Sequence, residues 1–249
     1  MSDDFYIGYQ KKAPTATARL IRGTIILLGL TILCGAALAG LLQHPADDGT
    51  FEFGVTREFR GTLLESPFPH FAFAENVEGT SFVAGDRAVL VAFGKFGMPE
   101  SLREGLGKSV TLRGSLIYRD TVAMIELATE DPMTIIGDGA SENFNTISPK
   151  TVTLTGELVD TKCYLGVMRP GEGKVHRACA SVCLRGGIPP GLLVRGENGA
   201  AVWFLVDPAT GEPLTIDPEL AGRALTVSGE AALFDNLPTL NVVSWEVAR

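Results

Sequence analysis

The side chains with the greatest chemical potential in this sequence lie close together. Residues 163–183 read CYLGVMRPGEGKVHRACASVC and contain three of the four cysteines and one of the three histidines. Thiolate sulfur and imidazole nitrogen bind Zn²⁺ and copper, cysteines hold iron–sulfur clusters, and paired cysteines form or exchange disulfides. The block therefore indicates a metal site, a redox-active thiol group or a disulfide-stapled loop.

A helix would gather most of these side chains. In residues 173–187, GKVHRACASVCLRGG, a histidine and two cysteines stand at i, i+3 and i+7, which places them on one helical face. The two glycines that close this stretch would end the helix. The third cysteine lies at the end of the predicted strand GELVDTKCY and would face the helix from there. The predicted metal ligands are Cys163, His176, Cys179 and Cys183.

Three other residues of the block have predicted supporting roles. Asp160 would accept a hydrogen bond from the histidine, Met168 would offer copper a thioether, and the positive charge of Arg177 would favour thiolate. For the ion itself, the ligand types favour Zn or Cu, with an iron–sulfur cluster as a third option.

Two interpretations without a metal stay open. A disulfide could join Cys163 to one helix cysteine, which leaves one thiol over, whereas a Cys179–Cys183 bond within one helix would be strained. A helix thiolate beside His176 could also be a nucleophile. The sequence contains no paired-carboxylate site, phosphate loop or dinucleotide fingerprint, and GEGK lacks the P-loop spacing. It therefore favours a protein that is not an enzyme and that binds no dinucleotide.

An apolar segment near the N-terminus predicts a membrane anchor. Residues 23–42, GTIILLGLTILCGAALAGLL, carry no charge and would cross a hydrocarbon core of about 30 Å as a helix. The apolar region of a cleaved signal peptide is shorter, at about 7–15 residues. We expect a cytoplasmic tail over residues 1–22 and a transmembrane helix over residues 23–43, in which Cys34 is a packing residue.

The flanking charges predict the orientation of this anchor. Lysines and arginines precede it and aspartates follow it, so the positive-inside rule places the N-terminus in the cytoplasm. In a bacterial host the chain would be a single-pass protein of the inner (cytoplasmic) membrane, with its bulk in the periplasm or outside. There, an odd number of clustered cysteines leaves one unpaired unless it binds something else. The formal net charge of −8 argues against a nucleic-acid partner.

The rest of the chain contains an internal repeat. Residues 107–127, GKSVTLRGSLIYRDTVAMIEL, align without a gap with residues 222–242, GRALTVSGEAALFDNLPTLNV, and RGTLLES at 60–66 aligns with TGELVDT at 155–161. The alignment matches glycines and aspartates in pairs, namely Gly61 with Gly156, Gly107 with Gly222, Gly114 with Gly229 and Asp120 with Asp235. Such a repeat indicates two related structural units.

Each unit has the pattern of a small β-barrel. Short segments with alternating or β-branched apolar residues are separated by Gly, Pro and Asp turns. About five strands per unit suit an OB-like barrel, with a β-sandwich as the alternative. We expect a mostly β protein in which an N-terminal transmembrane helix precedes two OB-like modules, the second with a short helical Cys/His insertion. The predicted ranges are 50–136 for module 1, 137–150 for a linker, 151–249 for module 2 and 163–190 for the insertion.

The Cys/His block accounts for most of the extra length of the second unit, and the first unit contains no cysteine. The barrel therefore does not need these cysteines to fold, which favours an added function. Residues 156–194, GELVDTKCYLGVMRPGEGKVHRACASVCLRGGIPPGLLV, resemble a D-x-x-C-Y … H-R-x-C-A-x-x-C … G-x-P motif of uncharacterised bacterial membrane-anchored exported proteins with OB-like modules. The resemblance implies that the four predicted ligands act together, and it implies no particular activity.

Together these patterns predict a membrane-anchored, extracytoplasmic metal-binding protein. It would be an accessory, electron-transfer or metal-handling subunit of a membrane-associated redox system, with the membrane and a larger membrane-associated protein complex as partners. The first alternative is a structural or assembly subunit in which the block is a disulfide or a Zn clip. The second alternative is a thiol–disulfide exchange protein.

Overall fold

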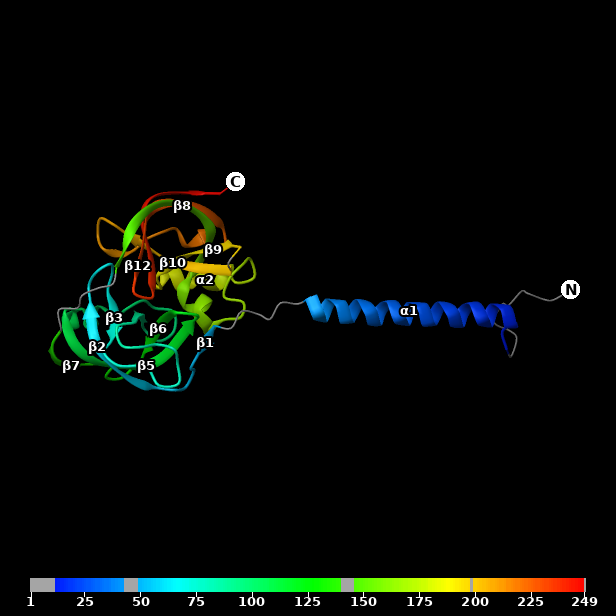
Figure 1. Cartoon of the computed structure of the whole chain (residues 1–249), viewed down its shortest axis with the longest axis horizontal. Coiled ribbons are helices and arrows are strands. Elements are labelled where there is room, and N and C mark those ends of the chain that lie inside the picture. Colours follow the sequence, from blue (N-terminus) through cyan, green and yellow to red (C-terminus); the bar gives the residue numbers. More distant parts are fainter. Residues whose placement is uncertain (1–11, 43–48, 140–145, 198, 249) are drawn as a thin grey trace. The chain divides into compact units, whose positions relative to one another are not determined.

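A computed structural model describes residues 12–42, 49–139, 146–197 and 199–248 of the chain (Figure 1). The chain divides into two compact units, Met1–Ala46 and Asp47–Arg249. Parts of the predicted cytoplasmic tail and linker, residues 1–11 and 140–145, lie outside the described residues, as does residue 43 at the end of the predicted span.

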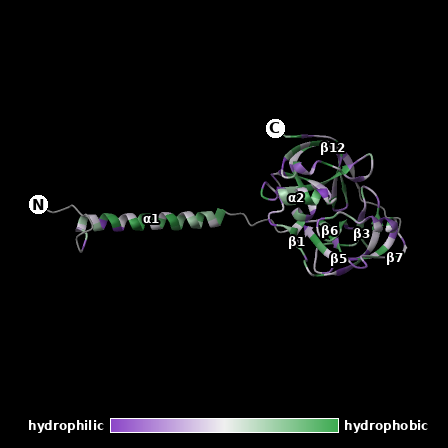
Figure 2. Ribbon diagram, turned by 180° about the vertical axis from the view of Figure 1, so that it is seen from behind, coloured by the Kyte–Doolittle hydropathy of each residue, from purple (hydrophilic) through white to green (hydrophobic). Residues whose placement is uncertain are grey.

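The first unit contains one long helix, α1 (Thr15–Leu42), which begins before the predicted span. At 1.5 Å per residue its 28 residues extend about 42 Å, which exceeds a hydrocarbon core of about 30 Å. Apolar residues occur along its length (Figure 2), and the hydroxyls of Thr24 and Thr31 donate to backbone carbonyls four residues earlier. The helix is long and apolar enough to cross a membrane.

Five strands of the second unit close into a first barrel. They are β2 (Arg57–Leu64), β3 (His70–Phe73), β4 (Arg87–Val91), β5 (Lys108–Arg119) and β6 (Val122–Leu127). The order around the barrel is β5-β2-β3-β4-β6, with β6 returning to β5; β4 and β6 run parallel and the other neighbours antiparallel. The short strands β1 (Thr50–Phe51) and β7 (Met133–Asp138) add to β5, and the 3₁₀ helix η1 (Glu100–Gly105) precedes it.

The second barrel repeats this arrangement strand for strand. Its strands are β8 (Thr146–Asp160), β9 (Pro190–Gly196), β10 (Gly199–Asp207), β12 (Ala224–Phe234) and β13 (Leu237–Val247), in the order β12-β8-β9-β10-β13 with β13 returning to β12. The parallel pair is again the third and fifth strands, β10 and β13. The short strand β11 (Glu212–Pro213) pairs with β10 in antiparallel orientation, and the 3₁₀ helix η3 (Pro218–Leu220) precedes β12. The predicted fold, a mostly β protein with two OB-like barrels and an N-terminal apolar helix, is confirmed.

The residues paired by the sequence repeat occupy equivalent places in the two barrels. Asp120 and Asp235 turn the hairpins β5–β6 and β12–β13 with φ values of 52° and 51°, a region in which short polar residues are tolerated. Gly114 and Gly229 lie where strands cross closely, since a Cβ on either would overlap a backbone carbonyl of the partner strand. The periodic glycines are therefore requirements of barrel closure.

The structure also modifies the predicted boundaries. Strands β7 and β8 extend into the predicted linker from both sides, because β8 continues to pair with β12 as far as Thr146. The expected helix over residues 173–187 is shorter, since α2 spans Arg177–Arg185 and Gly173 has a φ of 77°. The strand expected to carry Cys163 ends at Asp160, and the cysteine begins a π-helical turn, η2 (Cys163–Val167), instead.

Three apolar clusters hold the body together. One fills the first barrel and one fills the second, whereas the third lies between them and joins residues of both. In the third cluster Phe68 of the first barrel packs on Phe204 of the second, with ring centroids 5.8 Å apart. A buried guanidinium, that of Arg87, crosses the same interface to Asp235, with Nη2 2.8 Å from Oδ2. The two barrels therefore form one packed body.

Candidate metal centre

The insertion that distinguishes the second barrel lies between its first two strands. It occupies residues 161–189, where the first barrel has only residues 65–69, and it contains η2 and α2. Two of its cysteines, Cys163 and Cys183, belong to the apolar cluster between the barrels, and Cys179 packs against that cluster. The candidate centre is therefore built at the interface of the two barrels.

Three thiols converge in this insertion. The sulfur atoms of Cys163, Cys179 and Cys183 all lie within 4.8 Å of one another. Cys163 Sγ and Cys183 Sγ are 4.0 Å apart, which is too long for a disulfide bond, and these two cysteines are 4% and 1% exposed. Cys179 is only partly buried. Three sulfur atoms that could bind a soft metal ion thus lie close together, and two of them belong to cysteines that are buried from solvent.

A second group of potential ligands shares Cys163 with the first. Asp160, Cys163 and His176 each offer one ligand atom within 4.8 Å of the others, and all three residues are buried. The predicted hydrogen bond is present, with His176 Nε2 2.9 Å from Asp160 Oδ2. The four predicted ligands are therefore brought together as two overlapping groups, one of three thiols and one that contains the imidazole and a carboxylate.

Asp160 positions both groups. Its Oδ1 accepts the backbone N–H of Cys163 at 2.8 Å, while Oδ2 holds His176 immediately before α2. A buried carboxylate is stable only when its oxygens have partners, and here each oxygen has one. The last residue of β8 therefore fixes where η2 begins and where α2 begins.

The first barrel contributes a residue that the sequence did not reveal. Lys95, in the loop between β4 and η1, donates from Nζ to Cys179 Sγ across 3.1 Å. This hydrogen bond to the thiol raises the pKa of Lys95, so the lysine stays charged beside the cluster. No local pattern marks Lys95, because it lies in the barrel that lacks cysteines and meets Cys179 only through tertiary packing.

Two contacts hold the loop of Lys95 against the insertion. The buried Lys162 donates to the carbonyls of Ala92 and Gly94, at 3.0 and 2.6 Å, and pairs with Glu126. The backbone also approaches closely, because Gly97 N–H donates to Gly186 O at 2.9 Å. A Cβ on Gly186 would overlap the carbonyl oxygen of Lys95. Gly186, which caps α2, therefore also leaves space for the loop of the first barrel that carries Lys95.

The two buried thiols differ in acidity. The hydrogen bond between them raises the pKa of Cys163 and lowers that of Cys183; burial and the nearby Asp160 carboxylate raise the pKa of Cys163 further. Of the two, Cys183 therefore ionises more readily than Cys163. For the nucleophile hypothesis, the imidazole of His176 falls in the ligand group of Asp160 and Cys163, and the helix thiols Cys179 and Cys183 fall in the other group.

The remaining predicted residues are not gathered at the thiols. Met168 is 42% exposed and belongs to neither ligand group. Arg177 donates to the carbonyls of Ala221 and Gly222, so it fastens α2 to the chain ahead of β12. The histidine of β3, His70, is buried with Nδ1 2.7 Å from Phe68 O, and burial lowers its pKa to about 4.

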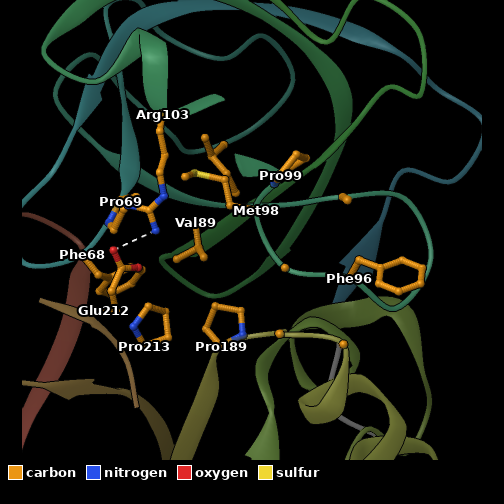
Figure 3. A pocket seen from close by; sticks show the side chains of 15 residues that line it. Phe68, Pro69, Val89, Phe96, Met98, Pro99, Arg103, Pro189, Glu212 and Pro213 are labelled. Atoms are coloured by element: carbon orange, nitrogen blue, oxygen red, sulfur yellow. Dashed lines mark hydrogen bonds and ion pairs between the residues drawn. The ribbon is translucent and has the colours of Figure 1, made fainter. Parts of the chain in front are cut away.

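A cavity of about 420 Å³ lies beside the loop contact, with one wall from each barrel (Figure 3). Phe68, Val89 and Met98 line the wall of the first barrel, and Pro189 and Pro213 line the wall of the second. An ion pair between Arg103 and Glu212, 2.8 Å long, bridges the two walls. None of the described cysteines lines this cavity, so it is distinct from the thiol cluster.

Fold and site together define a β protein of two OB-like barrels with a Cys/His group that could hold a metal ion. The chain matches no protein-family model, no curated protein and no solved structure. Function is therefore inferred from the geometry of the site.

Proposed function

We propose that this chain is a membrane-anchored, extracytoplasmic metal-binding protein that serves a membrane-associated redox system as an accessory, electron-transfer or metal-handling subunit. The observation that carries the proposal is the convergence of three thiols within 4.8 Å, next to a buried Asp–His pair, in an insertion that the first barrel lacks. Residues that serve only to stabilise a barrel would be expected in both copies.

α1 and its flanking charges support the proposed location. The helix is long and apolar enough to cross a membrane, and positive residues precede its uncharged run, residues 23–42. The positive-inside rule then supports an N-terminus in the cytoplasm and a body on the outer side of the bacterial inner membrane. A body with two packed barrels also offers a broad surface for docking to a larger membrane complex.

One distance favours the alternative, a structural subunit with a stapled insertion. Cys163 Sγ and Cys183 Sγ are 4.0 Å apart, and a small rotation of the side chains would allow a disulfide. Thiol–disulfide exchange is a further alternative, supported by the partly exposed Cys179 beside a lysine. The three functions differ in what the cluster contains after purification.

Elemental analysis with free-thiol counting separates them. The full chain would be purified in detergent from the membrane, without chelators or affinity metals. We expect about one equivalent of a transition metal per chain, lost in the Cys179→Ser, Cys183→Ser double variant and kept in the matched control Cys34→Ser, which changes the cysteine in α1. A metal-free chain with only one of the three clustered thiols free would instead establish a disulfide, and metal binding would be abandoned.

A further inference from the structure

The thiol group is a three-ligand site. Its described members are Cys163, Cys179 and Cys183, and the imidazole belongs to the other group, where Nε2 is engaged by Asp160. A structural Zn²⁺ site almost always has four ligands in tetrahedral geometry, and a catalytic one has three protein ligands plus water. Zn²⁺ at these thiols would therefore require either a shift of the imidazole or an open coordination position.

The surroundings of the thiols disfavour a bound water. Cys163 and Cys183 lie in the apolar cluster between the barrels, together with Tyr164, Leu165 and Ile188. An ion held there exchanges its water for sulfur and apolar neighbours. Soft ions tolerate this exchange best, because thiolates bind Cu(I) without the help of hard oxygen ligands.

Convergence of the three sulfurs also favours a single ion over a cluster. The cysteines of an iron–sulfur cluster are divided among two or more irons, and such clusters take four protein ligands. Here the sulfurs approach one another within 4.8 Å, and the described thiol group contains three. A single ion with three sulfur neighbours fits this arrangement.

Lys95 supplies the positive charge that such a site needs. Three thiolates around a monovalent ion carry net negative charge, and Asp160 lies close to one of them. The ammonium of Lys95, 3.1 Å from Cys179 Sγ, offsets part of that charge from the side of the first barrel. Its loop is held in place by the buried Lys162.

From these contacts we infer that the thiol cluster is a Cu(I) site, with Cys163, Cys179 and Cys183 as ligands and Lys95 as a positioning residue for Cys179. The inference rests on the proposed function and names the ion of that same site. Cys179, the partly buried ligand, is the side from which the ion enters and leaves. Binding releases the thiol protons to solvent and involves no change of oxidation state.

The test is a competition titration of the reduced full chain in detergent, under anaerobic conditions. Cu(I) would be added against a colorimetric Cu(I) chelator, and Zn(II) against a chromogenic zinc indicator. We expect about one Cu(I) per chain to be retained and to displace any bound Zn(II), whereas Zn(II) does not displace copper. X-ray absorption of the copper-loaded chain should show sulfur neighbours without a nitrogen.

Variants assign the roles. His176→Gln, which can keep a hydrogen bond to Asp160, should leave the copper stoichiometry unchanged, and Cys179→Ser should lose copper to the chelator. Lys95→Met should weaken Cu(I) binding about 10- to 100-fold, as is typical for partners of metal ligands, and Lys95→Arg should recover most of the loss. The thermal unfolding midpoint of each metal-free variant would show whether the effect is structural, because a positioning role changes affinity without changing that midpoint.

Two results would overturn the inference in distinguishable ways. Retention of Zn(II) with three sulfurs and one nitrogen, abolished by His176→Gln, would make the centre a four-ligand zinc site and leave the proposed metal-binding function standing. If the reduced chain retained neither ion, the proposed function and the inference would fail together. Should His176→Gln not fold, the neighbours seen by X-ray absorption in the unmodified chain decide between sulfur-only and mixed coordination.

Discussion

Asp160 uses both oxygens of one carboxylate to organise the candidate centre, because one fixes the backbone of Cys163 and the other holds His176. Lys95 acts in the same way on Cys179 from the other barrel. Neither residue is a member of the thiol group, yet both determine where its sulfurs lie. At the scale of single residues, the site therefore depends on polar partners as much as on its ligands.

His70 gives a prediction about pH. Burial lowers its pKa from about 6.5 to about 4, so the unfolded chain takes up the proton first as the pH falls. The contribution of His70 to the free energy of unfolding should be fully present above pH 6.5. It should be lost as the pH falls from 6.5 to 4, which lowers the stability by about 3 kcal/mol. Chemical denaturation at pH 7 and pH 4.5 would measure it.

His70→Gln is the matched variant for that experiment, since it removes the titrating group from β3 and leaves the other acid-sensitive pairs in place. The difference between its pH dependence and that of the parent isolates the contribution of His70. Equal losses of stability on acidification in the two proteins would contradict the prediction.

At the scale of elements, Gly186 has two structural roles, one at the end of α2 and one in the contact with the first barrel. It follows α2, and its backbone is approached by the loop that carries Lys95. Its φ of −78° is open to any residue, so only the missing Cβ matters at this position. Gly186→Ala should therefore test the loop contact without straining the helix end.

We expect Gly186→Ala to push the loop of Lys95 away from α2, because the new Cβ would overlap the carbonyl of that lysine. The cost should be about 1–3 kcal/mol, as for overpacked sites, and Cys179 should react faster with a maleimide. Thermal unfolding and the alkylation rate would measure the two effects. Gly137→Ala, at a position with nothing within 4 Å of the new Cβ, is the control, and equal behaviour of the two variants would rule the contact out.

The sequence predicted which strands and helices form better than it predicted the residues at which they begin and end. Glycine spacing and alternation identified both barrels, since these patterns are imposed locally by strand crossing and pleating. The five local candidates, Asp160, Cys163, His176, Cys179 and Cys183, all reach the two ligand groups. The helix predicted over residues 173–187 was too long at its start, since α2 begins at Arg177 and Gly173 has a positive φ. Lys95 was missed because its contact depends on how two barrels pack.

At the scale of the whole molecule, the internal repeat allows a matched comparison of equivalent residues in the two barrels. Asp120 and Asp235 have the same backbone conformation in equivalent hairpins, but only Asp235 binds the buried Arg87, which is 2% exposed, across the interface. Exchanging each aspartate for glycine removes the same side chain from the same turn. The comparison therefore measures the ion pair between barrels.

Asp235→Gly should destabilise the body by about 3 kcal/mol, because it leaves a buried guanidinium without its carboxylate. Asp120→Gly should stay within about 1 kcal/mol of the parent, since glycine adopts a positive φ readily. Denaturant unfolding of both variants would measure the difference. Similar values for the two would show that Arg87 gains little from the contact.

The position of Lys95 in the first barrel also bears on biogenesis. A ribosome makes the chain from its N-terminus, so the strands of the first barrel and the loop that carries Lys95 are complete before Cys163 is synthesised. The surface on which the insertion packs can therefore fold before the clustered cysteines emerge. Newly made thiols would then meet a docking surface already in place, which limits the time during which they are open to oxidants or to wrong metals.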